Sequence, residues 1–429
     1  MKIAIIGSGI AGLTAAYQLA KEPSNQVSLI ERENRIGLDS HGTAVNDLLL
    51  DVPPRMFNST LWPELSRLYR EIGLGDSSVD SSQSFCEGAS SQGSDTQNSC
   101  YFKIGNVARP KPTVTQFFNR TARQISSETK RLMDQGRHDL ADDALDKITL
   151  HEYIVQNNYS QNFVDGFLYP TLASTVCTCS YDSLKNYPAA VILLALRDLT
   201  SDAELCRVAG GSKAVVERLT RDINDVRTDC DVRSVSMLPN GVLVSINGDA
   251  PESFDHVIMA TQANNAADLV QDISNNEKRL LRSIRYEDIQ VSLHQDATLM
   301  PGRRSDWACF NMVSNAEMSA AQCTVWMNRF DRRLGEGTDY FQTIGPIQNI
   351  KPEHVVSTAS LQRPIVGLET KKALQDIASN LQEPGRRIWY AGSWANYGIP
   401  LLESAVVSAQ QSVRSIQAAR DETLSVFRG

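Results

Sequence analysis

The stretch Lys2-Ile3-Ala4-Ile5-Ile6-Gly7-Ser8-Gly9-Ile10-Ala11-Gly12 decides how this chain folds. Its apolar beginning predicts a buried parallel strand, and residues 13–20 predict the helix that follows. The pattern G-x-G-x-x-G lies between the two, where a strand–turn–helix unit can bind a dinucleotide. We therefore expect an α/β fold that begins with a nucleotide-binding turn.

Each glycine of this turn has its own steric role. Gly7 makes the tight turn, Gly9 lets the backbone approach a pyrophosphate, and Gly12 lets the helix pack closely on the strand. The helix start at Ile10 and Ala11 presents free N–H groups and the positive end of the helix dipole to the anion. The alternative is a tight glycine turn that binds no ligand.

A second apolar run, Val27–Ile30, ends in Glu31, about 20 residues beyond the turn. A carboxylate at this place can accept a hydrogen bond from a ribose hydroxyl, and it would repel a 2′-phosphate. Strand, helix and acid agree with one another, so we expect a bound dinucleotide other than NADP.

Length and charge limit the possible functions. The 429 residues suggest two closely joined domains. The net charge of -8 argues against nucleic acid as a partner, because no basic stripe is available to neutralise phosphates. No signal peptide precedes Lys2 and no apolar run is long enough to span a membrane, so a transmembrane segment is not expected. Peripheral membrane contact stays open.

The cysteines predict an intracellular, cytoplasmic protein. All 8 are scattered along a chain that is long enough to fold without disulfides, so we expect reduced thiols. Cys177-Thr178-Cys179 is the one close pair, and on a strand both thiols would share a face. No second Cys or His pair lies nearby in the sequence, so we expect no metal site.

The remaining pattern predicts further elements. Residues 75–99 are rich in Ser, Gln, Gly and Asp, which predicts an exposed loop. Residues 113–205 are helical in pattern and predict a helical cap. The expected helices cover 59–73, 113–137, 189–199, 213–223 and 402–418, and the expected strands cover 232–235, 242–246, 254–261, 289–294, 323–328, 340–344 and 387–391.

Motifs along most of the chain resemble the flavin-dependent amine oxidase superfamily, and in particular a thinly characterised branch of predicted NAD/FAD-binding proteins. The matching motifs occur in order at residues 31–37, 50–58, 62–65, 167–170, 186–188, 210–212, 293–301, 307, 324–328, 363–365 and 392–409. The resemblance implies FAD as cofactor and a discontinuous, Rossmann-like FAD-binding domain built from residues 1–58, 205–285 and 380–429. It also implies a substrate domain of a mixed sheet and helices, from residues 59–204 and 286–379.

The resemblance also implies which residues meet the FAD. At the first fingerprint these are Arg32 and Gly37, which follow Glu31. Near the C-terminus Gly392 and Ser393 lead into a second helix start at Glu403, whose dipole would stabilise negative charge on a reduced flavin. The stretch Pro53–Met56, which includes Pro54 and Arg55, would face the isoalloxazine ring. The backbone of Val232 would contact the adenine. For Val232, a plain core position stays open.

The chain departs from bacterial members of this branch in three places. It has Leu38 where they have a second glycine, and Pro400-Leu401-Leu402 where they have His-Glu-Asp. It also has Arg363 where they have histidine. Proton chemistry that depends on those histidines would be absent here.

Few side chains are candidates for chemistry, because a flavin needs mainly a dry, apolar place for the substrate. His41, just beyond the Gly37 turn, is a candidate proton carrier, and its alternative is a hydrogen bond to loop backbone. Arg55 could steady a reduced flavin or a substrate carboxylate, and its alternative is an ordinary ion pair. Trp326, Asn328 and Tyr397 are candidates for the substrate wall, with core packing as the alternative for the two aromatic residues.

Three functions follow as hypotheses. The first is an FAD-dependent oxidoreductase that removes a hydride from a small apolar or amine substrate. The second is a redox-neutral isomerase of unsaturated fatty acids, which takes a hydride and returns it. The third is a flavin-binding module without turnover.

Overall fold

A computed structural model describes residues 1–88, 97–106, 119–141, 143–200, 204–383 and 385–426. The G-x-G-x-x-G turn belongs to a five-stranded parallel sheet of order β19-β13-β1-β2-β9. Its strands are β1 (Lys2–Ile6), β2 (Gln26–Ile30), β9 (Asp225–Arg227), β13 (His256–Met259) and β19 (Ile388–Tyr390). Strands from both ends and the middle of the chain thus form one sheet.

The alternating side chains of β1 explain how this sheet is covered. Ile3 and Ile5 pack on one face in a core with α1 (Ile10–Ala20), α9 (Gly211–Thr220) and α14 (Leu402–Val426). Ala4 and Ile6 pack on the other face against a small antiparallel sheet and further helices. These are β10 (Val232–Leu238), β11 (Gly241–Ile246), β12 (Glu252–Phe254), α10 (Ala263–Leu269), α11 (Asn275–Arg282) and α13 (Thr370–Leu381).

A second, seven-stranded sheet has the order β18-β14-β17-β16-β15-β6-β7. Its strands are β6 (Gln83–Glu87), β7 (Ser99–Ile104), β14 (Arg285–His294), β15 (Phe310–Ser314), β16 (Ala321–Trp326), β17 (Phe341–Ile344) and β18 (Val355–Ile365). The pair β15–β6 is parallel and the other pairs are antiparallel, so the sheet is mixed.

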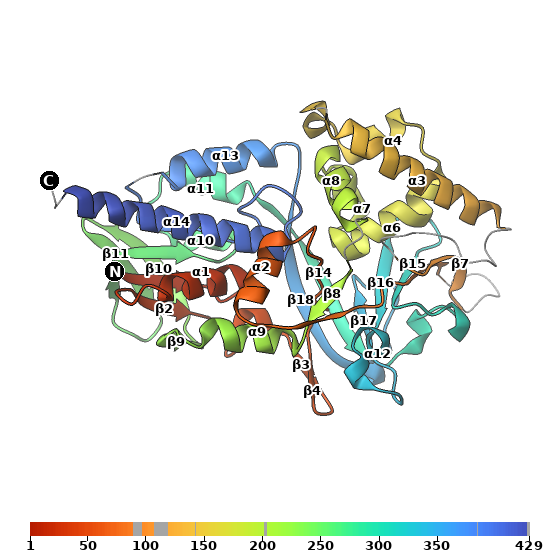
Figure 1. Cartoon of the computed structure of the whole chain (residues 1–429), viewed down its shortest axis with the longest axis horizontal. Helices are drawn as coiled ribbons and strands as arrows, with labels where there is room; N and C mark the ends of the chain where they lie inside the picture. Colours follow the sequence, from red (N-terminus) through yellow and green to blue (C-terminus); the bar gives the residue numbers. More distant parts are fainter. Residues whose placement is uncertain (89–96, 107–118, 142, 201–203, 384, 427–429) are drawn as a thin grey trace.

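Helices gather at the end of the molecule that carries the mixed sheet, away from both termini (Figure 1). They are α3 (Arg120–Asp139), α4 (Leu150–Gln156), α5 (Gln161–Phe163), α6 (Tyr169–Thr171), α7 (Tyr181–Lys185) and α8 (Ala189–Leu199). The remaining labelled helices and strands are α2 (Pro63–Glu71), α12 (Met327–Phe330), β3 (Thr43–Val45), β4 (Leu48–Leu50), β5 (Asp76–Ser78) and β8 (Cys206–Val208). Within the described ranges, no helix is both long and apolar enough to cross a bilayer.

Three sequence expectations are corrected by the structure. The prediction of an exposed loop over residues 75–99 is wrong at β6, where Phe85 and Cys86 are fully buried. Residues 89–96 of that stretch lie outside the described ranges. The helix expected from residue 113 is described from Arg120, after an Asn119 cap, and residues 113–118 also lie outside these ranges. The pair Cys177 and Cys179 follows a π-helical turn instead of lying on a strand.

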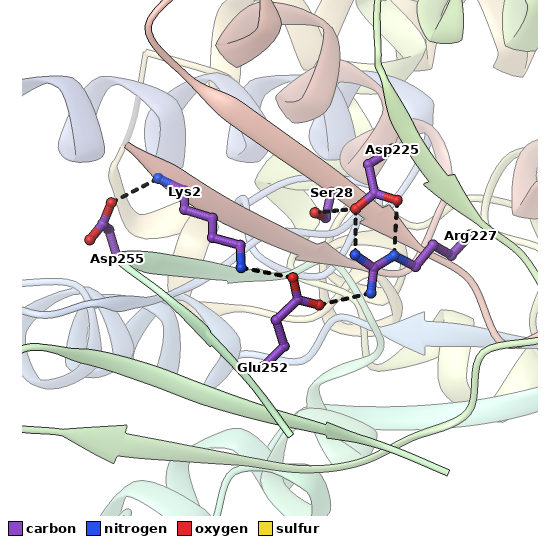
Figure 2. A network of polar contacts seen from close by, with 6 residues as sticks. All are labelled: Lys2, Ser28, Asp225, Arg227, Glu252 and Asp255. Atoms are coloured by element: carbon purple, nitrogen blue, oxygen red, sulfur yellow. Dashed lines mark hydrogen bonds and ion pairs between the residues drawn. The ribbon is translucent and has the colours of Figure 1, made fainter. Parts of the chain in front are cut away.

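A polar network ties the parallel sheet to β12 (Figure 2). Arg227 pairs with both carboxylate oxygens of Asp225, at 2.9 and 2.6 Å, and with Glu252 at 2.8 Å. Lys2 Nζ lies 2.8 Å from the other oxygen of Glu252, and the Lys2 N–H donates to Asp255. These bonds, above all those from the Arg227 guanidinium, lower the pKa of Asp225 and Glu252. The network therefore joins the edge strand β9 and the central strand β1 to β12 while its carboxylates are ionised.

Candidate cofactor and substrate site

One cavity of about 730 Å³ runs from the β1–α1 turn to the mixed sheet. The starts of two helices contribute to its wall, α1 through Gly9, Ile10 and Ala11, and α14 through Leu402 and Ala405. The two helices also pack against each other through the core under the parallel sheet. Two positive helix ends therefore face one space, although they lie at opposite ends of the sequence.

The three glycines of the turn differ in what surrounds them. Gly7 has a φ of 99°, and a Cβ there would lie 2.7 Å from the Ala260 carbonyl oxygen. A Cβ on Gly12 would lie 1.9 Å from the Gly7 carbonyl oxygen, which is a prohibitive clash. A Cβ on Gly9 would meet no atom within 4 Å. Gly7 and Gly12 are thus required by the fold, whereas Gly9 leaves open space at the cavity wall.

The acid after β2 fastens the turn. Glu31 is buried, and its Oε2 accepts hydrogen bonds from the Ser8 N–H at 2.9 Å and from the Ser8 hydroxyl. That hydroxyl in turn accepts from the Gly37 N–H at 2.6 Å. A side chain on Gly37 would crowd Gly9 and Glu31, at 3.1 and 3.2 Å. Glu31 and Gly37 line the cavity, as does Arg32, which is exposed and pairs with Glu33.

A second wall comes from the middle of the chain. Val232, at the start of β10, lines the cavity together with Cys230 and Asp231. Residues after β13 also line it, and the sequence analysis did not propose them: Thr261, Gln262, Asn265, Asp268 and Leu269. The polar residues that follow the apolar run of β13 were the available signal, because ligands bind at the carboxyl ends of parallel strands.

The C-terminal segment matches the expectation only in part. Gly392 and Ser393 line the cavity, and Ser408 holds Gly392 by accepting from its N–H at 3.0 Å. Glu403 does not line the cavity, so its expected place beside the cofactor is corrected. Its carboxylate accepts from the N–H groups of Glu64 and Leu65, at 3.0 and 2.8 Å, and so caps the start of α2. Burial raises the pKa of Glu403.

Two guanidinium groups also line the cavity. Pro54 and Arg55 line it, and Arg55 donates to the Leu38 carbonyl at 3.0 Å. Arg363, on β18, lines it as well. A further set of lining residues is mostly apolar and comes from helical segments and the mixed sheet: Thr175, Val176, Thr178, Ile289, Val291, Phe310, Ile344 and Leu361.

Four residues that the sequence offered as candidates for catalysis or for the substrate wall do not line this cavity. His41 is exposed. The Trp326 indole donates to Asp339 at 2.9 Å, and the Asn328 amide donates to two loop carbonyls. The Tyr397 hydroxyl donates to Asp146 at 3.0 Å. The structure thus gives Trp326, Asn328 and Tyr397 other partners, and it places His41 at the surface.

The mixed-sheet residues of the wall were missed by the sequence analysis. On β14, Ile289 and Val291 alternate with polar neighbours, which was a usable signal for one buried face. Gln83 also lines the cavity, but it lay in a stretch that was interpreted as a loop. Arg363 was noted only as a departure from related sequences, not as a site residue.

Comparison with known proteins gives the family and the fold. Residues 10–291 match the sequence model of a family described as flavin containing amine oxidoreductase. No curated protein matches the sequence.

Among solved structures, putrescine oxidase bound to putrescine superimposes with a TM-score of 0.67 at 14% identity, covering 97% of this chain and 99% of that one. A CLA-producing fatty acid isomerase from P. acnes gives 0.65 at 14%, covering 96% and 97%. Cyclohexylamine oxidase from Brevibacterium oxydans IH-35A gives 0.64 at 13%, covering 98% and 99%. At such identities the likeness establishes a shared fold.

Proposed function

The chain belongs to the family of flavin-containing amine oxidoreductases, and from this premise we propose that it is an FAD-dependent oxidoreductase that removes a hydride from a largely apolar substrate. One observation carries the proposal. A single cavity connects the G-x-G-x-x-G turn with an apolar chamber on the mixed sheet. A nucleotide site and a substrate chamber in one cavity are what a hydride transfer from substrate to flavin requires.

The residues of this cavity fit FAD. Gly9 leaves free space beside the start of α1, where backbone N–H groups can receive a pyrophosphate. Glu31 lies at the end of β2, where a carboxylate can accept a hydrogen bond from a ribose hydroxyl. We propose that Val232 borders the adenine, and that Gly392, Ser393 and the start of α14 border the flavin.

The remaining chemistry needs little from side chains. When bound, FAD supplies an acceptor for a hydride from a substrate carbon. The apolar wall of Val176, Ile289 and Phe310 would exclude water and hold that carbon in place. Among the described residues that line the cavity there is no histidine or lysine. The proposed hydride transfer therefore relies on how the wall positions the substrate carbon, and it uses neither a histidine nor a lysine.

A spectrum and an anaerobic screen test this function. We expect the purified protein to be yellow, or to become yellow on reconstitution with FAD. Amines, fatty acids and isoprenoids are then mixed with the holoprotein without oxygen, and we expect one class to bleach the visible flavin absorbance. A protein that stays colourless with FAD would refute the proposal.

The same screen separates the isomerase. If an unsaturated fatty acid is turned over without any electron acceptor and without net flavin reduction, the protein is a redox-neutral isomerase and not an oxidoreductase. Bleaching that is reversed only by an added acceptor supports the oxidoreductase.

A further inference from the structure

Arg363 has a charge that the described protein does not balance. It lies near the end of β18 and lines the cavity, as do its strand neighbours Leu361 and Gln362. Its Nε and Nη2 atoms have no contact with solvent, and they find no hydrogen-bond acceptor among the residues that the structure describes. Buried guanidinium groups are normally paired.

Within the part of the chain that the structure describes, no carboxylate forms an ion pair with Arg363. The ionisable groups that act on it most are the Tyr187 hydroxyl, the thiols of Cys177 and Cys179, and a second guanidinium, that of Arg55. Burial lowers the pKa of the Arg363 guanidinium, but an arginine still stays charged in a protein.

The nearest candidate acid along the sheet is already engaged. Glu287 lies directly opposite Arg363 in the β14–β18 ladder. Its carboxylate accepts from the Ser180 N–H at 2.8 Å, from the Ser180 hydroxyl at 2.9 Å, and from Ser183. The carboxylates that do line the cavity, Glu31, Asp231 and Asp268, belong to the segments that surround the nucleotide turn.

Resting on the proposed function, we propose that Arg363 binds the carboxylate of the substrate, and that the substrate is an apolar carboxylic acid and not a cationic amine. A planar guanidinium can hold a carboxylate through two parallel hydrogen bonds. The apolar residues beside it, such as Leu361 and Val291, would cover the hydrocarbon part. An alkylammonium would instead face two guanidinium groups, those of Arg363 and Arg55, with no partner for its own charge.

The test compares three probes of equal chain length: dodecanoate, dodecylamine and dodecanol. Their binding to the FAD holoprotein is measured by calorimetry and by perturbation of the flavin spectrum. We expect dodecanoate to bind at least about 10-fold more tightly than dodecylamine and dodecanol. Arg363→Gln should weaken dodecanoate binding by about 10- to 100-fold and leave dodecanol binding unchanged. Arg363→Lys should restore part of the loss.

Arg285→Gln is the matched control, because Arg285 lies on the neighbouring strand and is exposed. It should bind dodecanoate as the wild type does. Equal affinity for the three probes in the wild type, or unchanged dodecanoate binding in Arg363→Gln, would overturn the proposal. Loss of FAD from Arg363→Gln would also overturn it, since Arg363 would then hold the cofactor. If the wild-type protein takes up no FAD, the proposed oxidoreductase function itself is refuted. The flavin spectrum shows this outcome separately from the binding of the three probes.

Discussion

The Glu31 carboxylate accepts hydrogen bonds from both the backbone N–H and the hydroxyl of Ser8. This joins the acid at the end of β2 to the middle of the glycine turn after β1. The turn is therefore held in shape before any ligand arrives, and a preformed loop loses less entropy when it binds.

The other oxygen of Glu31 accepts a hydrogen bond from the Glu33 N–H at 3.0 Å. We predict that Glu31→Gln weakens FAD binding by about 10- to 100-fold, because an amide has one acceptor oxygen and cannot accept hydrogen bonds from Ser8, Glu33 and a ribose hydroxyl together. Fluorescence titration of the apoprotein with FAD measures the change. Glu33→Gln is the control, since Glu33 is exposed and pairs only with Arg32 among the described residues. Equal FAD affinity in Glu31→Gln and wild type would show that Glu31 only shapes the turn.

Gly9→Ala should fold normally and bind FAD poorly. The backbone of Gly9 has φ -63° and ψ 177°, which alanine adopts without strain, and the new methyl group would meet no protein atom. It would instead occupy the space where a pyrophosphate approaches. Thermal unfolding of the apoprotein and titration with FAD separate the two effects. Gly105→Ala, another glycine with free space around it, is the control. Undiminished FAD binding by Gly9→Ala would place the pyrophosphate elsewhere.

The sequence predicted those parts of the fold whose signals are local. The strand–turn–helix of residues 2–20 and the apolar helix Ala189–Leu199 are confirmed, because their patterns are complete within a short window. β6 was missed for the opposite reason. Its Ser84 hydroxyl donates to Asn311, 227 positions away, so a polar stretch is buried by a partner that no local window contains.

The same limit applies to the site. Glu403 was assigned to the cofactor because it begins a helix that faces the cavity, but its partners are backbone N–H groups of α2, more than 300 positions away. For Arg363 the important fact is the lack of a partner among the described residues. A lack of partners in three dimensions has no signature in the sequence.

We expect Glu403→Ala to lower the free energy of unfolding by about 1–2 kcal/mol, because two N–H groups at the start of α2 lose their acceptor. FAD affinity should change less than about twofold by the same argument, since the side chain serves α2 and not the cavity. Urea unfolding and FAD titration give the two values, and Glu217→Ala on the exposed side of α9 is the control. A large loss of FAD affinity at unchanged stability would restore Glu403 to the cofactor site.

Arg227→Gln should remove part of the acid sensitivity of the protein. The folded-state pKa values of Asp225 and Glu252 lie below their ordinary 3.8 and 4.5, so their contribution to stability is present above those values. That contribution is lost as the pH falls from the ordinary pKa values through the lower folded-state pKa values. We expect Arg227→Gln to cost about 1 kcal/mol at neutral pH, because the network is partly exposed.

The difference between wild type and Arg227→Gln should shrink below about pH 4. Urea unfolding between neutral and acid pH measures this. Lys213→Gln, which breaks a fully exposed pair with Glu217, should leave the curve unchanged. A difference that stays constant down to acid pH would mean that Arg227 stabilises by packing and not by charge.

Arg363→Met should make the ligand-free protein more stable, by about 1–3 kcal/mol, because it removes a charged group whose buried Nε and Nη2 atoms lack a partner among the described residues. Urea unfolding without added carboxylate measures the gain. Arg285→Met, at an exposed position, should stay within about 0.5 kcal/mol of the wild type. A clear destabilisation by Arg363→Met would mean that the guanidinium already has a stabilising partner.

The strand order of the parallel sheet also dictates when it can be completed during synthesis. β1 ends at residue 6, yet its neighbour β13 begins at residue 256 and the edge strand β19 at residue 388, so they leave the ribosome much later than β1. At translation rates of about 5–20 residues per second, that interval is on the order of a minute. The apolar edge of β1 stays unpaired until β13 emerges, and the edge of β13 then stays unpaired until β19 emerges. The parallel sheet therefore cannot close before nearly the whole described chain has been made.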